Sequence, residues 1–248
     1  MKITAYIILF SMSLYALSCE DVAKKAYEQV SGFKTSVSST TMILTNAQGV
    51  QNIRKIKIKK LESENGDRSL LSFLYPNDLK GTKLLSYEVI GGDDKQWLYL
   101  PALKRIKRIS SRNKSGSFMA SEFSYEDIAS QNYKNYTYPC EAKSLDINGT
   151  KYFEIMRVPK DKNSGYSKQI LYIEADTSLT RYGKYYDKHN KLLKKISFPK
   201  YIALNGVQRV QKIVMHNIQN KKMSTLTWDD DKTGVKLSSK EFTKRALK

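Results

Sequence analysis

The best candidates for binding chemistry lie between residues 96 and 127, where an apolar run, a basic segment and a glycine-containing loop with large apolar side chains follow one another. Apolar side chains bind acyl chains through the hydrophobic effect, and a loop that carries them can open and close over a cavity. The apolar residues expected to line such a cavity and its gate are Trp97, Tyr99, Phe118, Met119, Phe123 and Tyr125. The basic residues expected to steer the protein toward anionic head groups or an acidic partner are Lys104, Arg105, Lys107, Arg108 and Arg112.

The same side chains have a plainer interpretation. Phe118 and Met119 are large enough to fill a hydrophobic core, and core packing accounts for them as well as a gate does. Lysines that alternate with isoleucine, as Lys57 and Lys59 do around Ile58, are typical of the solvated face of a half-buried strand. The sequence leaves both interpretations open.

No pattern of catalytic or metal-binding residues stands out in the sequence. The two histidines, His189 and His216, are far apart and have no neighbouring cluster of ligands. The chain has no G-x-S-x-G nucleophile elbow and no phosphate-binding loop. The carboxylates of residues 229–231 do not have the spacing of an EF-hand loop, so we interpret them as a polar turn. We therefore expect no catalytic residue, no metal site and no cofactor.

The composition is strongly basic. A formal net charge of +19 and a pI near 9.7 imply attraction to polyanions, which are nucleic acids, anionic membranes or acidic proteins. The lysines are spread over the whole chain rather than gathered on one element, which argues against a nucleic-acid surface. We expect a membrane surface or an acidic protein as the partner, and no nucleic acid.

The N-terminus has the pattern of a secretory signal peptide. Met1 and Lys2 form a short positive start, residues 3–17 are mostly apolar and uncharged, and Ala16–Ser18 has the small-x-small pattern of a cleavage site. The apolar run is shorter than the roughly 20 residues that a transmembrane helix needs. We expect residues 1–18 to be removed and residues 19–248 to form a single exported domain, either soluble or lipid-anchored.

The two cysteines, Cys19 and Cys140, leave three arrangements open. Ala16–Cys19 approximates a lipobox, although Ala16 stands where leucine is usual, and lipidation of Cys19 would tether the protein to a membrane. A disulfide between Cys19 and Cys140 is allowed in an oxidising compartment, and two free thiols are the third arrangement. Sequence alone does not fix the connectivity, and we favour lipidation of Cys19.

The elements that would position these residues are mainly strands. Residues 20–30 have apolar side chains at helical spacing, and Gly32 follows where a glycine often ends a helix. From Ser36 onward the apolar period changes to two, with turn residues at hairpin spacing. Short helices are expected within residues 121–130, starting at Ser121, and over residues 238–247. The pattern predicts a mainly β protein with one curled antiparallel sheet.

The order of motifs resembles the LolA type of periplasmic outer-membrane lipoprotein-sorting proteins. The resemblance rests on W-L-Y-L-P at Trp97–Pro101, K-R-I-K-R-I at Lys104–Ile109 and S-G-S-F-M at Ser115–Met119, and it is loose elsewhere. It implies an open, incomplete β-barrel with a few short helices covering the concave face, including the helix of residues 20–30. It also favours a strand for Lys104–Ile109, whose apolar spacing fits a helix equally well.

The function that the resemblance implies is carriage of lipid without catalysis. Such a protein would lie in the periplasm and bind lipid or lipoprotein acyl chains in an apolar cavity, either as a free carrier or as a tethered receptor. Its partners would be the acyl chains, the membrane surface and an inner-membrane transporter. The alternatives are a non-enzymatic envelope adaptor that binds a protein through its basic surface, and a hydrolase whose site the sequence does not reveal.

Overall fold

The computed structural model describes residues 17–248, so the predicted signal peptide lies outside the described residues except for Leu17 and Ser18. The helices and 3-10 turns are α1 (Cys19–Val30), η1 (Pro101–Leu103), η2 (Ser111–Asn113), η3 (Phe118–Ala120), α2 (Tyr125–Ile128), η4 (Tyr133–Asn135), η5 (Ser239–Phe242) and η6 (Lys244–Leu247). The strands are β1 (Thr35–Thr45), β2 (Gln51–Leu61), β3 (Arg68–Tyr75), β4 (Lys83–Tyr87), β5 (Lys95–Leu100), β6 (Arg105–Ile109), β7 (Tyr136–Thr137), β8 (Lys143–Ile147), β9 (Thr150–Pro159), β10 (Tyr166–Glu174), β11 (Thr180–Asp187), β12 (Leu192–Leu204), β13 (Val207–Asn217) and β14 (Met223–Thr233).

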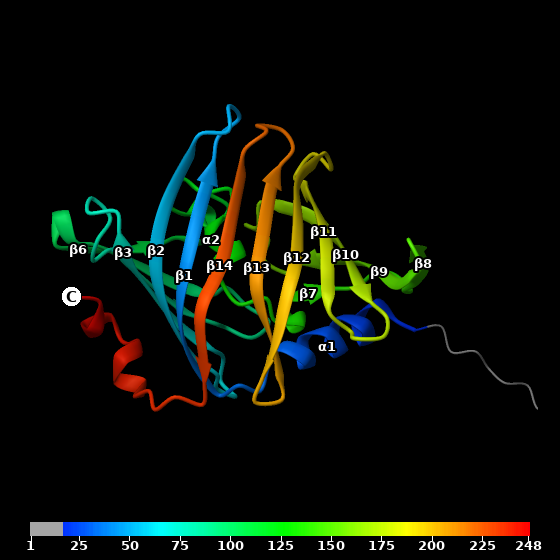
Figure 1. Cartoon of the computed structure of the whole chain (residues 1–248), viewed down its shortest axis with the longest axis horizontal. Coiled ribbons are helices and arrows are strands. Elements are labelled where there is room, and N and C mark those ends of the chain that lie inside the picture. The colour runs from blue at the N-terminus through cyan, green and yellow to red at the C-terminus, as the bar shows by residue number, and fades with distance from the viewer. Residues whose placement is uncertain (1–16) are drawn as a thin grey trace, which may run out of the picture.

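The strands form one strongly curled antiparallel sheet (Figure 1). Its order is β6-β5-β4-β3-β2-β1-β14-β13-β12-β11-β10-β9-β7, with β8 also paired to β9. The edge strands β6 and β7 do not pair with each other, so the barrel is open. The predicted fold, a mainly β open barrel with few helices, is confirmed, and so is the strand predicted for Lys104–Ile109.

Helix α1 lies across the barrel, on its concave side, and contacts β9 and β13 (Figure 1). It begins where Ser18 Oγ accepts a hydrogen bond of 3.1 Å from the backbone N–H of Asp21, which satisfies one of the free donors of the first turn. Val22, Ala23 and Ala26 are its buried face. The helix predicted for residues 20–30 is therefore confirmed.

The strands β3, β4 and β5 are covered on both faces. Because side chains alternate along a strand, Leu71 points into the main core while its neighbour Leu70 points to the convex side. There Leu70 and Leu85 pack against Phe242 and Leu247 of the C-terminal segment, and all four side chains are buried. The sheet thus separates two hydrophobic clusters, one on each face.

The C-terminal segment forms two 3-10 turns, η5 and η6, instead of the helix predicted over residues 238–247. Thr243 separates the two turns with extended backbone (φ −119°, ψ 156°), and its side chain caps the second turn by accepting from the backbone N–H of Ala246. The segment is shaped by the sheet surface that it covers rather than by its helical propensity.

The connection between β6 and β7 crosses the concave side and carries α2. The prediction that Ser121 caps this helix is wrong, because the Ser121 hydroxyl donates to the carbonyl of Phe118 (2.7 Å). Ser124 caps α2 instead, in a reciprocal pair of hydrogen bonds with Asp127. The Asp127 carboxylate also accepts from the Tyr166 hydroxyl and lies 3.1 Å from Lys194 Nζ. These bonds fix the connection against β10 and β12.

Candidate functional site

An apolar cavity of about 350 Å³ lies on the concave side of the sheet. This volume is within the range of about 300–1,000 Å³ that is usual for ligand pockets. Apolar side chains from both halves of the sheet form most of its wall, among them Met42, Ile56, Ile196, Ile213, Leu226 and Trp228. The sheet therefore encloses space that its own side chains do not fill.

Strand register explains the continuity of the apolar wall. Met42 of β1 lies opposite Leu226 of β14, and Leu226 lies opposite Ile213 of β13. Residues that are directly opposite across neighbouring strands share one face of the sheet. The three side chains therefore form a stripe across the concave face.

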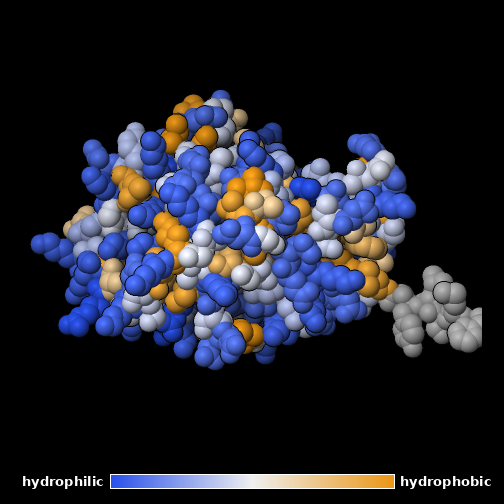
Figure 2. All heavy atoms as spheres, turned by 60° about the horizontal axis from the view of Figure 1, so that its bottom comes forward, coloured by the Kyte–Doolittle hydropathy of each residue, from blue (hydrophilic) through white to orange (hydrophobic). Residues whose placement is uncertain are grey.

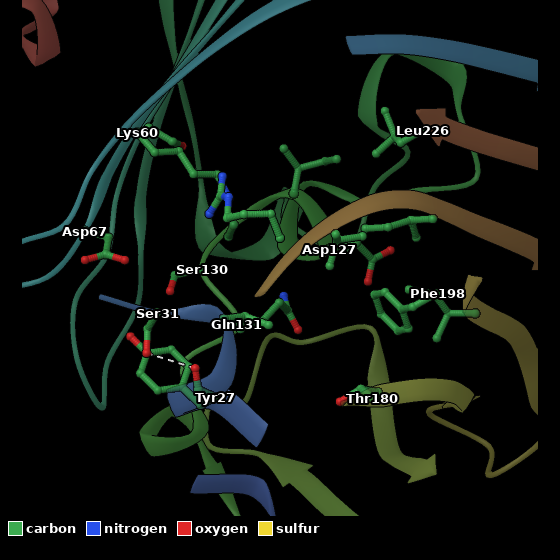
Figure 3. Close-up of a pocket in the computed structure, with 18 of the residues that line it drawn as sticks. Tyr27, Ser31, Lys60, Asp67, Asp127, Ser130, Gln131, Thr180, Phe198 and Leu226 are labelled. Atoms are coloured by element: carbon green, nitrogen blue, oxygen red, sulfur yellow. Dashed lines mark hydrogen bonds between the residues drawn. The ribbon is translucent and has the colours of Figure 1, made fainter. Parts of the chain in front are cut away.

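One end of the cavity is polar. Figure 3 shows Tyr27, Ser31, Lys60, Asp67 and Ser130 gathered on one side of the cavity, away from Phe198 and Leu226. Burial, followed by the nearby charge of Glu88, raises the pKa of Asp67 to about 6. An amphiphile would meet polar groups at one end and apolar side chains at the other.

The outer surface near this end is mixed. Figure 2 shows the molecule with the end that carries α1 turned forward, and apolar patches lie there among hydrophilic side chains.

Of the six apolar residues predicted to line the cavity, one does so, Phe123. The prediction is wrong for Trp97 and Tyr99, which point to the convex face and pack beside Phe242 and Leu247. The reason is the alternation of β5, in which Leu98 belongs to the concave core and its two neighbours face the other way.

Phe118, Met119 and Tyr125 pack in the core beside the cavity. The Phe118 ring is fully buried between Phe73 and Tyr125, with ring centroids 5.9 and 5.5 Å apart. The Met119 carbonyl accepts a hydrogen bond from Arg54. Phe118 thus has the plainer role of core packing, and a gating movement of this loop stays a prediction.

The five predicted basic residues, Lys104, Arg105, Lys107, Arg108 and Arg112, are all exposed. They lie on or beside β6, outside the cavity and at the edge of the sheet. Charged side chains on an edge strand discourage pairing with another chain, so the location alone gives them a structural role. Their role in steering the protein toward anionic surfaces stays a prediction.

Cys19 is joined to Cys140 by a disulfide, with 5.8 Å between the two Cα atoms. The favoured prediction, lipidation of Cys19, is therefore wrong, because a sulfur in a disulfide has no valence left for a lipid. The second of the three arrangements is the one observed. The bond ties the first residue of α1 to the segment between β7 and β8.

Neither a metal cluster nor a membrane-crossing helix occurs in the part of the chain that the structure describes. In residues 17–248, no group of three or more histidine, cysteine, aspartate or glutamate side chains is placed to hold a metal ion. No helix within these residues is long and apolar enough to cross a membrane.

Most of the cavity wall was missed at the sequence level. The alternation of Ile56 and Ile58 with lysines shows that one face of β2 is buried, and both isoleucines do line the cavity. Nothing local distinguishes a side chain that lines a cavity from one that fills a core, so the lining residues of β13 and β14 had no separate signal.

Comparison with solved structures identifies the family. The outer membrane lipoprotein-sorting protein domain from Vibrio parahaemolyticus is 37% identical to the chain, with a TM-score of 0.87, over 92% of this chain and 97% of that one. The chain belongs to the family of this outer membrane lipoprotein-sorting domain. The predicted resemblance is thereby confirmed.

This family member is also similar to two other solved structures. A DUF1329 family protein from Desulfovibrio piger is 28% identical with a TM-score of 0.86, over 93% of this chain and 98% of that one. A LolA superfamily protein from Nitrosomonas europaea has the same fold at 18% identity and a TM-score of 0.76, over 93% of this chain and 100% of that one. The family model that matches residues 65–248 carries the description "Uncharacterized protein". No curated protein matches the chain.

Proposed function

We propose that this protein is a periplasmic carrier that binds the acyl chains of a lipid or lipoprotein in its cavity. The observation that carries the proposal is the unfilled apolar space on the concave side of the sheet. Burial of an acyl chain supplies about 0.8 kcal/mol per methylene group, and it requires no specific contact with each atom. A cavity of this kind suits apolar cargo better than a polar substrate.

The family supports this proposal. The relative from Vibrio parahaemolyticus is named for the sorting of outer membrane lipoproteins. Transfer between membranes would require a partner on each side, and an inner-membrane transporter is the partner that we propose for loading. The exposed basic residues beside β6 are the surface that we propose for contact with anionic membrane or an acidic partner.

The disulfide favours a free carrier over a tethered receptor. A disulfide persists in an oxidising compartment such as the bacterial periplasm, which agrees with export. Because Cys19 is consumed by this bond, it cannot hold the protein on a membrane.

Mass spectrometry of the protein purified from its native envelope tests the proposal. Organic extraction should release lipid in near-stoichiometric amount from the wild type. Leu226→Trp places an indole in the cavity and should abolish this lipid, whereas Thr227→Trp, on the opposite face of β14, should retain it.

Two outcomes would contradict the proposal. Equal lipid content in both variants would place the lipid outside the cavity. A wild-type protein that carries no lipid and binds no fluorescent fatty acid would favour the envelope adaptor, which needs only its basic surface.

A further inference from the structure

Arg157 of β9 is a buried cation without an acidic partner. It is 6% exposed, and none of the ion pairs within residues 17–248 involves it. The other buried cations within these residues each have one: Lys114 lies 3.1 Å from Asp93, Lys194 lies 3.1 Å from Asp127, and Arg209 lies 2.9 Å from Asp231. Buried charges are normally paired, so the isolation of Arg157 requires an explanation.

The groups that touch Arg157 are neutral. Its Nε donates to Gln169 Oε1 (2.7 Å), and its Nη2 donates to Gln131 Oε1 (2.9 Å). The guanidinium carbon lies 3.8 Å from the centre of the Tyr136 ring, a stacking contact. A tyrosine is uncharged at neutral pH, and burial raises the pKa of Tyr136 further. This cage orients the guanidinium without neutralising it.

The acidic side chains of α2 are engaged elsewhere. Glu126 accepts from the Ser164 hydroxyl (2.6 Å) and from the backbone N–H of Gly165 (2.8 Å). Asp127 is paired with Lys194. Neither carboxylate is in position to serve as the counter-ion of Arg157.

The cage is open toward the cavity. Arg157, Gln131 and Tyr185 all line it, and the apolar side chains of Leu171 and Ile173 stand next to them on β10. Figure 3 shows Gln131 projecting into the space between the polar end and Phe198. A ligand in the cavity would therefore meet a cation and an apolar wall together.

We propose that Arg157 binds the anionic group, a carboxylate or a phosphate, of an amphiphile whose acyl chain occupies the apolar part of the cavity. This inference rests on the proposed function and names its substrate class. The planar guanidinium presents paired donors that match both oxyanions, and the water-poor surroundings strengthen the contact. A neutral lipid would leave the cation unpaired, so the site selects anionic cargo.

Matched probes test this selection. The wild type, Arg157→Gln and Lys168→Gln are titrated with a fluorescent fatty acid and with the methyl ester of the same acid. Lys168→Gln is the control because it also removes one positive charge. Lys168 precedes Gln169 on β10, so its side chain faces outward, where it stacks on Tyr186. Arg157→Gln should weaken binding of the acid about tenfold or more and leave the ester unchanged, while Lys168→Gln should change neither.

The outcomes separate this inference from the proposed function. A wild type that binds neither probe would overturn the proposed function. A wild type that binds acid and ester equally, or a folded Arg157→Gln variant that loses both alike, would overturn the anionic site without overturning lipid binding by the wild type. The comparison of acid with ester in the wild type needs no variant, so it tests the anionic site even if Arg157→Gln does not fold.

Inorganic phosphate distinguishes the source of the anion. If the anion is part of a lipid, millimolar phosphate should not displace the bound fatty acid, because phosphate alone buries no apolar surface. Displacement by phosphate would assign the site to a free anion and would overturn the amphiphile.

Discussion

Removal of the Cys19–Cys140 disulfide should destabilise the protein and loosen helix α1. The bond joins residues 121 positions apart in the sequence. Closing a loop of this length removes entropy from the unfolded chain worth about 5 kcal/mol in the chain-entropy model, and native disulfides typically contribute about 2–5 kcal/mol. We therefore expect Cys19→Ser/Cys140→Ser to lower the free energy of unfolding by about 2–5 kcal/mol.

Two observables should report the change. For a chain of this size, each 1 kcal/mol corresponds to about 2–4 °C in melting temperature, so the variant should melt about 4–20 °C lower. Helix α1 keeps the burial of Val22, Ala23 and Ala26, so it should remain docked on average. Its backbone amides should nonetheless exchange hydrogen faster, because the tether at its first residue is gone.

Urea unfolding with and without a reducing agent measures the stability, and alkylation counts the thiols. The chain has two cysteines, so the mature wild type should show no reactive thiol before reduction and two afterwards. The double serine variant is the control, since the reducing agent should not affect it. A free Cys140 thiol in the untreated protein, together with an acyl mass on Cys19, would refute the disulfide and restore the lipid anchor.

Three further perturbations have expected outcomes. Burial and the charge of Asp127 raise the pKa of Glu126 to about 7 from its usual 4.5, so the wild type should lose stability as the pH rises from 4.5 to 7. Glu126→Gln should lack that loss. By urea unfolding, this variant should be about 1–3 kcal/mol more stable than the wild type at pH 8, but not at pH 4. Lys194→Met leaves the Asp127 carboxylate without its cation and should lower the free energy of unfolding by about 3 kcal/mol. Thermal unfolding measures this loss, and an unchanged melting temperature would contradict the role of the pair. Phe242→Ala should cost about 3–5 kcal/mol because its ring is fully buried on the convex face, yet fatty-acid binding should persist, since the ring lies beside Trp97 and outside the cavity.

The strand pattern could be predicted from the sequence because it is local. Alternation such as that of Ile56 and Ile58 with lysines appears wherever one face of a strand is buried. Alternation does not say which buried face is concave, and β5 is covered on both sides. Trp97 and Tyr99 were therefore assigned to the cavity, whereas the C-terminal segment, more than a hundred residues later, covers them.

The site was less predictable because it depends on contacts that are distant in sequence. The disulfide joins two cysteines whose proximity exists only in the folded chain, and the local pattern around Cys19 favoured a lipid anchor instead. Arg157 had no signal of its own, because one arginine in an apolar strand looks the same whether a carboxylate faces it or not. Family resemblance supplied the architecture but not the inward faces.

Both ends of α1 are fixed to the body of the protein. The disulfide holds Cys19, and at the other end the Glu62 carboxylate accepts hydrogen bonds from the backbone N–H groups of Gly32 (2.9 Å) and Lys34 (2.6 Å). The helix is therefore held at both ends, and neither end can act as the free end of a hinged lid. A wider entry to the interior would therefore require movement of parts other than α1, either the connection between β6 and β7 or the open margins of the sheet.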